Sequence, residues 1–233
     1  MQDLFSALTL ADIHRPLIRN IVSLRVSQDL FDDLSDDPDA WRSAQALEMH
    51  TKPGLYQSTQ PVIDRSFEQA EWENAIAYPF KHTSVSRYSD GGFGVWYGAD
   101  TIETSVYETV HHWKKRLLDD AGYTQAGIVM ERKVYQVQCD ALLIDLRPMI
   151  ASHPAITHAS DYTLTHQIGS KLYREGHPGL VTASARVANG EVYALFNAKV
   201  LSHPAMICNL TYTTTASGVN VEREIGCDFM CIN

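Results

Sequence analysis

Hydrophobic residues in the first part of the chain recur at the spacing of a helix. After Pro16, which is allowed in a first helical turn, apolar side chains follow at Leu17, Ile21, Leu24 and Phe31. A Lys-Pro-Gly turn signal at residues 52–54 closes this segment. The pattern predicts an N-terminal helical extension over residues 1–55, followed by a single globular unit over residues 56–233.

The middle of the chain predicts a short strand that leads into a helix. Val95, Trp96 and Tyr97 form a short apolar run that is typical of a buried strand. From Asp100 or Thr101, either of which is a plausible N-cap, apolar residues recur at helical spacing, at Ile102, Val106, Val110, Trp113 and Leu117. Glu108 falls almost opposite this stripe. It therefore faces solvent, unless the far side of the helix lines a cleft.

Strands and hairpins dominate the second half of the pattern. Residues 128–138 and 141–146 predict two strands, and a helix follows from about Asp161 to Gly176. The Asn-Gly pair at 189–190 predicts a hairpin between strands at 180–187 and 191–200, and residues 209–224 predict another. Hairpins mixed with helices favour an α+β fold with a mostly antiparallel sheet.

Composition narrows the possible functions. The chain has 233 residues, 45% of them hydrophobic, and a net charge of −9 with no basic run. This balance argues against direct nucleic-acid binding and favours a small molecule or a protein as partner. The N-terminus lacks a basic segment followed by an apolar core, and no apolar run is long enough to cross a bilayer, so we expect no membrane association and a cytoplasmic location.

Cysteines and histidines do not form a recognisable metal motif. Of the four cysteines, Cys227 and Cys231 are close in sequence, but no second pair or suitably spaced histidine accompanies them. His111 and His112 are adjacent, so on a helix they point about 100° apart. We therefore predict ordinary thiols and no metal.

One stretch, from Arg87 to Glu108, combines groups that suit a phosphorylated ligand. A guanidinium can bind two phosphate oxygens at once, and the glycine turn at Gly91, Gly92 and Gly94 offers exposed backbone N–H groups. Tyr88 and Tyr97 lie within reach in sequence and could stack on a flat ring. A carboxylate such as Glu108 could stabilise positive charge on a sugar during glycosyl transfer.

The same residues resemble the RES-domain family, which is named for an arginine, a glutamate and a serine. The likeness rests on Arg87 with its glycine turn, on Tyr97-Gly98-Ala99, and on the run ETSVYE that ends at Glu108. The later stretch GHPGLVTASARVANGEVYALFN supplies Ser184 as the family serine. Arg65, in VIDRSF, is the candidate for the first arginine. The likeness covers roughly residues 60–200.

The resemblance implies an activity and a partner. Family members are toxins of bacterial toxin–antitoxin pairs, with a fold related to that of ADP-ribosyltransferases. NAD would be the substrate and nicotinamide the leaving group, with ADP-ribose passed to a protein, to phosphate or to water. The implied partner is a DNA-binding antitoxin that occludes the cleft.

The resemblance also implies roles for the individual residues. Arg87 and Arg65 would bind the pyrophosphate of NAD, with a backbone contribution from Gly92. Tyr97 and Tyr88 would contact a base, and Glu108 would act on the ribose. Ser184 would hold the substrate by a hydrogen bond.

Two other function classes remain open at this point. The first is a non-enzymatic module that recognises a phosphorylated ligand through Arg87 and the glycine turn. The second is a hydrolase that uses Ser184 and a histidine, although the G-x-S-x-G elbow is missing.

Overall fold

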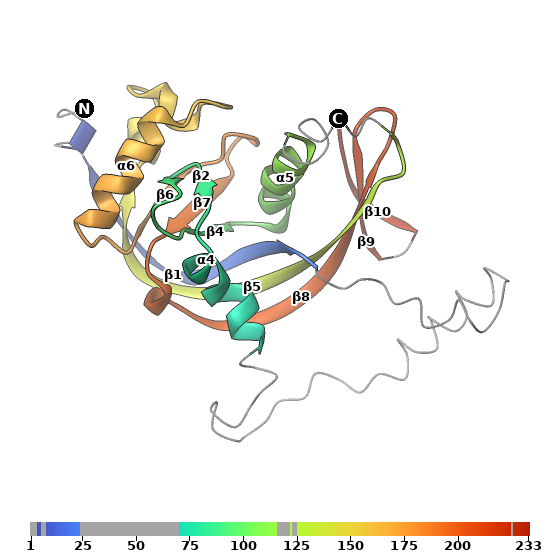
Figure 1. Ribbon diagram of the computed structural model, residues 1–233, viewed down its shortest axis with the longest axis horizontal. Coiled ribbons are helices and arrows are strands. Elements are labelled where there is room, and N and C mark those ends of the chain that lie inside the picture. Colours follow the sequence, from blue (N-terminus) through green and yellow to red (C-terminus); the bar gives the residue numbers. More distant parts are fainter. Residues whose placement is uncertain (1–3, 6–7, 24–69, 116–121, 123–124, 225) are drawn as a thin grey trace, which may run out of the picture.

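The computed structural model describes residues 4–5, 8–23, 70–115, 122, 125–224 and 226–233. In these residues the chain forms an eight-stranded sheet, a two-stranded sheet and several helices (Figure 1). All the strand pairs described are antiparallel except that between β5 and β6. The predicted α+β class with a mostly antiparallel sheet is confirmed.

Three long strands run side by side across the molecule (Figure 1). They are β1 (Thr9–Val22), β5 (Val129–Asp145) and β8 (Leu201–Thr214). β1 pairs with β5 over its whole length, from Thr9 opposite Asp145 to Val22 opposite Arg132. β8 pairs with the other edge of β5. The hairpin strands β9 (Val219–Glu224) and β10 (Cys227–Ile232) extend the sheet beyond β8.

Three short strands close a ring with β1 and β5. They are β4 (Trp96–Ala99), β6 (Gly179–Ala183) and β7 (Glu191–Leu195). β1 pairs with β4, β4 with β7, β7 with β6, β6 with β5, and β5 with β1. A separate two-stranded sheet, β2 (Val85–Ser86) and β3 (Ser89–Asp90), carries Arg87 in its turn.

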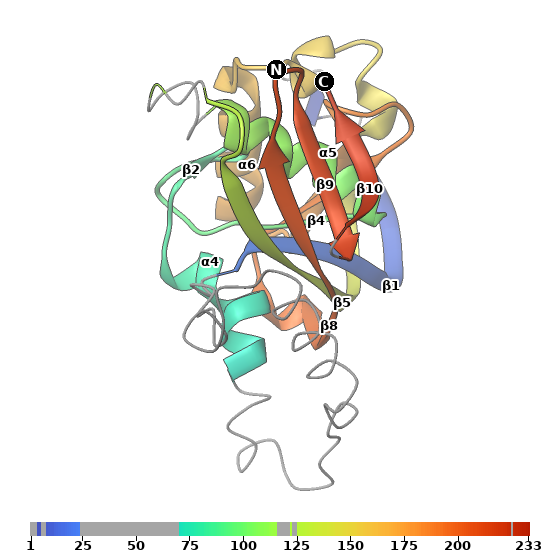
Figure 2. The ribbon, with the colours of Figure 1, turned by 90° about the vertical axis from the view of Figure 1, so that its right-hand side faces the viewer.

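The two longer helices, α5 (Ile102–Trp113) and α6 (Thr163–Arg174), lie on the same side of the long strands (Figure 1). Seen from the side, β8, β9 and β10 stand in front of α5 (Figure 2). A π-helical turn, η2 (Glu73–Ala77), leads into the short helix α4 (Tyr78–Lys81). Short 3₁₀ turns are η4 (Arg147–Met149), η5 (Pro154–Thr157) and η6 (Ala198–Val200). None of the helices described is long and apolar enough to span a membrane.

The apolar stripe of α5 fixes how the helix sits on the sheet. Val106, Val110 and Trp113 are buried in one hydrophobic cluster with Tyr212 and Val221 from β8 and β9. The Thr101 side chain caps the helix by accepting a hydrogen bond from Thr104 N. Thr101 is one of the two residues predicted as the N-cap. With the stripe against the sheet, Glu108 is directed to the other side of the helix.

The predicted N-terminal helix is wrong for the segment that the structure describes. Thr9–Val22 is strand β1, and its first half alternates between buried Ala11, Ile13 and Leu17 and exposed residues such as Asp12. In the second half, buried Leu17 and pocket-lining Ile18 lie on opposite faces of the strand, so apolar residues are found on both faces and their spacing resembles that of a helix. The predicted boundary at residue 55 lies outside the described residues, but β1 belongs to the same sheet as the rest.

The predicted break at Cys139-Asp140 is also wrong. β5 is one strand of 17 residues. Val137, Cys139, Ala141 and Leu143 are buried in alternation, while Asp140 is exposed between them. The polar residue is part of the strand period and not a turn. The predicted 189–190 hairpin is confirmed, since β6 and β7 pair across it and Asn189 has a φ of 63°.

Candidate functional site

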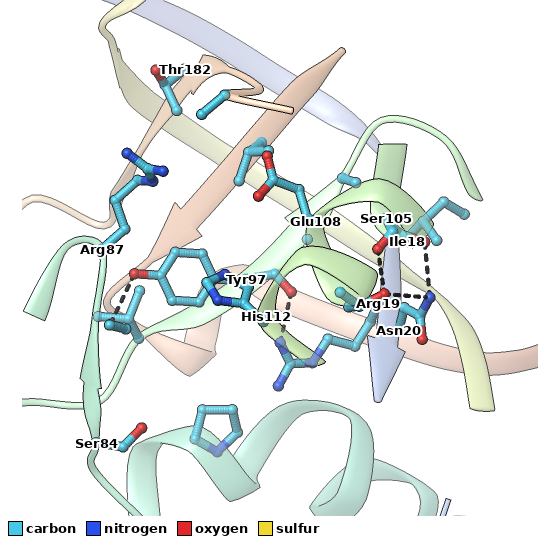
Figure 3. A pocket seen from close by; sticks show the side chains of 18 of the residues that line it. Ile18, Arg19, Asn20, Ser84, Arg87, Tyr97, Ser105, Glu108, His112 and Thr182 are labelled. Atoms are coloured by element: carbon cyan, nitrogen blue, oxygen red, sulfur yellow. Dashed lines mark hydrogen bonds between the residues drawn. The ribbon is translucent and has the colours of Figure 1, made fainter. Parts of the chain in front are cut away.

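A pocket of about 330 Å³ opens between α5, the short helix α4 and the strands β1, β4 and β6 (Figure 3). Its walls include two arginines, Arg19 and Arg87, one carboxylate, Glu108, and the ring of Tyr97. Ile18, Val95, Ala99 and Val192 supply apolar surface. A mostly apolar cavity with a few convergent polar groups is typical of a ligand site.

Glu108 projects from α5 into this pocket, and its side chain is 18% exposed. Its Oε1 accepts a hydrogen bond of 2.7 Å from Ser184 Oγ. Arg186 Nε lies 4.0 Å from the other carboxylate oxygen, and the Arg186 side chain is 9% exposed. Of the two alternatives left open by its position on the helix, solvent or a cleft, Glu108 therefore faces a cleft.

Ser184 is held in place by the turn that follows β6. Its Oγ accepts hydrogen bonds from the backbone N–H groups of Arg186, at 3.0 Å, and Val187, at 3.2 Å, while it donates to Glu108. Within the described residues, no hydrogen bond joins Ser184 to a histidine. The hydroxyl therefore orients the carboxylate and has no base beside it that would make it a nucleophile.

Arg87 sits in the turn between β2 and β3 and lines the pocket. Its Nη1 donates to His158 O at 2.9 Å and to Ile156 O at 3.4 Å, and its guanidinium lies 4.6 Å from the centre of the Tyr162 ring. These contacts satisfy one edge of the guanidinium with neutral groups. Its positive charge is therefore not neutralised by them and remains available to an anion.

Tyr97 presents its ring to the pocket while its hydroxyl is fixed. The OH donates to Ser86 Oγ at 2.9 Å and accepts from Tyr88 N at 3.0 Å. Burial raises the pKa of this hydroxyl to about 12. The phenol stays neutral at physiological pH, so the ring is a rigid wall for a flat or sugar-like group and not an acid or base.

Arg19, on β1, is a pocket residue that the sequence analysis missed. Its Nη1 donates to Tyr97 O at 2.8 Å, and its guanidinium lies 5.4 Å from the centre of the Trp96 ring. The side chain is partly exposed, but its Nε atom is buried without a hydrogen-bond partner in the described residues. Burial and the nearby charge of Arg132 lower its pKa to about 10. A cation that is desolvated and lacks a carboxylate partner in the described chain is suited to an anionic ligand.

A buried polar network joins the floor of the pocket to α5. Asn20 Nδ2 donates to Tyr212 OH at 2.9 Å, to Ser105 Oγ at 3.3 Å and to Thr109 Oγ1 at 3.4 Å. Arg132 Nε donates to Asn20 Oδ1 at 2.7 Å. The network ties α5 to both β1 and β5, so the position of Glu108 relative to Arg19 is set by the fold.

Ser184 does not itself line the pocket but contacts it through Glu108, whereas Tyr88 and Gly92 lie away from it. Tyr88 is fully buried in a core cluster with Ile168 and Leu172 of α6, and burial raises the pKa of its hydroxyl above the usual range. Gly92 is exposed, and its N–H already donates to Asp90 Oδ1 at 3.1 Å. Neither residue lines the pocket as the structure has it. Arg65 lies outside the described residues.

Glycine in this turn allows close packing, and the predicted phosphate contact stays a prediction. A Cβ on Gly94 would lie 2.2 Å from Pro79 O and 2.7 Å from Phe80 Cα, so glycine lets α4 rest directly on the turn. Gly91 has a φ of 104°, which other residues rarely adopt. The turn therefore places α4, and α4 forms one side of the pocket.

Metal chemistry has no candidate site in the described part of the chain, where no three histidine, cysteine or acidic side chains cluster. All four cysteines are free thiols, as expected. Burial raises the pKa of Cys139 to about 11. That thiol is inert at physiological pH.

Comparison with known proteins identifies the family. The model of the RES domain matches residues 63–215. The chain belongs to the RES domain family. Arg87, Tyr97, Glu108 and Ser184 of this RES domain lie inside the matched range, as does Arg186, whereas Arg19 precedes it. No curated protein sequence matches the chain.

Among solved structures, this RES domain is similar to the crystal structure of the M. tuberculosis MbcT–MbcA toxin–antitoxin complex. The TM-score is 0.45 and the sequence identity 11%, with 88% of this chain and 90% of that chain covered.

Arg19 and Arg186 could have been found from weaker signals. Arg19 interrupts the apolar run LIRNIV, where a charged side chain has few reasons to be placed unless it is functional. Arg186 follows Ser184 by two residues in the Ser-Ala-Arg sequence of the family stretch. Only the fold brings Arg19 to the site, because it comes from a strand far earlier in the chain.

Proposed function

We propose that this RES domain consumes NAD by breaking the bond between nicotinamide and ribose, and passes ADP-ribose to an acceptor. The observation that carries the proposal is the Glu108 carboxylate, held by Ser184 at 2.7 Å in a pocket that also contains Arg19, Arg87 and Tyr97. Family membership supports NAD as the substrate.

In the proposed reaction, the C1′–N bond breaks and nicotinamide leaves with the bonding electron pair. Positive charge then develops on the ribose ring, and Glu108 stabilises it. Ser184 donates a hydrogen bond to the carboxylate and Arg186 lies beside it, so both orient it. Its second oxygen accepts a hydrogen bond from a ribose hydroxyl. An acceptor oxygen forms the new bond to C1′ and gives up its proton.

The pyrophosphate of NAD would lie between the two arginines. Arg87 reaches the pocket from the turn between β2 and β3, and Arg19 reaches it from strand β1. Neither arginine forms an ion pair with a carboxylate in the described chain. In Figure 3, Arg87 and Glu108 lie on one side of Tyr97 and Arg19 lies on the other, and the Tyr97 ring would contact the nicotinamide ribose.

We further propose that the chain is the toxin of a toxin–antitoxin pair. Loss of NAD would stop growth, and a cognate antitoxin, not this acidic chain, would bind DNA. Inhibition would require the antitoxin to cover the pocket mouth. The acceptor of ADP-ribose, whether protein, phosphate or water, is decided by experiment.

The test is release of nicotinamide from NAD by the purified chain, with and without phosphate. Glu108→Gln should reduce the rate by about 100-fold or more, because one preorganised group that stabilises transition-state charge contributes on that order. Glu103→Gln is the matched control, since Glu103 lies on the same helix and is exposed outside the pocket. Dependence on phosphate would identify phosphorolysis, and expression of the wild type, but not of Glu108→Gln, should arrest growth.

The same assay separates the alternative functions. A non-enzymatic binding module would release no nicotinamide in either form. A serine hydrolase would be labelled at Ser184 by a serine-reactive phosphonate, whereas the hydrogen bond to Glu108 predicts that Ser184 stays unlabelled.

A further inference from the structure

An aromatic pair lines the pocket at α4, formed by Tyr78 on the helix and His82, which caps its C-terminal end. The Tyr78 side chain lines the pocket although it is 54% exposed, and its ring centre lies 4.4 Å from that of His82 with an interplanar angle of 33°. Val85, 51% exposed, and Ser84 line the pocket next to it. Tyr78 and Val85 therefore expose large apolar groups to solvent at the pocket.

The pair stands on a rigid base. Ala75 and Ile76 of η2 are fully buried, and Trp96 Nε1 donates to Ala75 O at 2.7 Å. Pro79 rests directly on Gly94, as described above. The exposed rings therefore lie on a segment whose backbone packs against the rest of the protein. This is the arrangement expected of a preformed binding surface.

The position of the pair relative to Glu108 indicates what it binds. In Figure 3, Arg87 lies on the same side of Tyr97 as Glu108 and Thr182, Arg19 lies on the other side, and the α4 ribbon and Ser84 lie beyond Tyr97 and Arg19 as seen from Glu108. A dinucleotide has two bases separated by a pyrophosphate. With the reacting nicotinamide ribose at Glu108 and the pyrophosphate at the arginines, the second base reaches the α4 side.

We infer that Tyr78 and His82, bordered by Val85, form a stacking subsite for the adenine base of the dinucleotide. A purine offers two flat faces that stack on an aromatic ring, and the Ser84 hydroxyl can exchange a hydrogen bond with its edge. The inference rests on the proposed function and deepens it. The subsite makes the chain prefer a dinucleotide to its nicotinamide half.

The test compares ligands with and without adenine on the full chain. Tyr78→Ala should raise the Kd of ADP-ribose, measured by calorimetry, by about tenfold, as expected for loss of one base–aromatic stack. The KM for NAD should rise by a similar factor while kcat is unchanged, and kcat/KM for nicotinamide mononucleotide should not move. Tyr78→Phe should behave as wild type. Leu142→Ala, which removes an exposed apolar side chain outside the pocket, is the control.

Each outcome decides a different point. Wild-type Kd for ADP-ribose in a folded Tyr78→Ala variant would overturn the subsite, and would leave the exposed pair to contact a protein. Equal losses with NAD and nicotinamide mononucleotide would also overturn it, because the effect would then not follow the adenine. A wild type that binds ADP-ribose through Tyr78 but releases no nicotinamide would keep the subsite and refute the proposed enzyme. A chain that neither binds nor cleaves would refute both.

Discussion

At the scale of single residues, the site is built from charges that the fold leaves unneutralised. Glu108 has a hydroxyl donor at 2.7 Å and an arginine at 4.0 Å, and Arg87 is bound to two backbone carbonyls. Arg19 is the extreme case, because its contacts are a carbonyl and the face of Trp96. Such unpaired charges lower the stability of the ligand-free chain, and they favour the binding of a charged ligand.

Arg19→Met tests whether the Arg19 charge lowers stability and favours ligand binding. The guanidinium has a lowered pKa in the folded chain, so holding it charged at neutral pH opposes folding. Methionine keeps much of the apolar packing against Trp96 and removes the charge. We expect the free energy of unfolding in urea to stay the same or to rise by about 1 kcal/mol. The KM for NAD should increase about tenfold or more, because a charge-assisted contact to the pyrophosphate is lost.

A matched variant separates charge from packing in that experiment. Arg15→Met removes another β1 arginine whose guanidinium is paired with Glu191 at 2.5 Å outside the pocket, so it should lower stability and leave KM unchanged. If Arg19→Met instead unfolds the chain or leaves KM as in the wild type, Arg19 is a structural residue.

Residue identity in the sequence predicted part of this site. Arg87, Tyr97, Glu108 and Ser184 were named from local motifs, and the structure brings all four to one place. Tyr88 lies next to Arg87 in the two-residue turn between β2 and β3, but its side chain is buried in the core. The sequence marks Arg19 only as a charged residue in the segment LIRNIV, and its place in the site depends on the fold, because its partners Trp96 and Tyr97 are distant in sequence.

At the scale of elements, α4 and the glycine turn form one unit that shapes the pocket. Gly94 allows Pro79 and Phe80 to approach closer than any side chain would permit. The three glycines in the sequence suggest a phosphate-binding loop. A glycine that lets the backbone approach a phosphate and one that lets it approach a helix look the same in the sequence. Spacing alone does not distinguish a backbone that approaches a ligand from one that approaches a helix.

Gly94→Ala should displace α4. The added Cβ would lie 2.2 Å from Pro79 O, and backbone cannot move aside as a flexible side chain can. We expect the free energy of unfolding to fall by about 1–3 kcal/mol and the KM for NAD to rise with it. Urea unfolding and nicotinamide release measure the two effects.

Gly92→Ala, in the same turn, is the control for that prediction. Its new Cβ would lie 3.2 Å from Asp90 Oδ1, which belongs to an exposed side chain that can turn away. Stability should therefore change little. A rise in KM for Gly92→Ala alone would restore the sequence-based expectation that this glycine contacts the substrate.

Strand β1 shows why element type was harder to predict than fold class. The second half of β1 packs on both faces, and Pro16 precedes it as a proline often precedes a helix. In the strand, Pro16 is tolerated since β4 pairs with β1 only further along, at Ile18, so its missing N–H interrupts no ladder on that edge. The hairpins at the C-terminal end carried stronger signals, because Asn-Gly and alternation are local features.

At the scale of the whole molecule, the ring of pairings β1-β4-β7-β6-β5 is joined by one charged network. Arg147 donates to both carboxylate oxygens of Asp145, at 2.8 and 2.7 Å, and to Glu191, which also accepts from Arg15. These residues come from β1, β7, the end of β5 and the turn η4. The network therefore links three strands of the ring through side chains, in addition to their backbone hydrogen bonds.

This network predicts a pH dependence of stability. Burial alone would raise the pKa values of Asp145 and Glu191, but hydrogen bonds and charge from Arg147, with Tyr193 at Glu191, lower both overall. A carboxylate with a lowered folded pKa stabilises the fold fully above its unfolded pKa, and this contribution is lost as pH falls through the folded value. The free energy of unfolding should therefore decline as pH falls below about 4.5.

Arg147→Met should remove much of that dependence. At pH 7 we expect a loss of about 1–2 kcal/mol, since the two carboxylates are only partly buried and remain partly hydrated. As pH falls from about 5 to about 3 the wild type should lose stability faster than the variant, so that their urea midpoints converge. Arg174→Met, on the exposed face of α6, is the control and should run parallel to the wild type. Curves for Arg147→Met that stay parallel to the wild type would mean that other carboxylates govern the acid response, and that the ring is held by its strand pairs and core without help from this network.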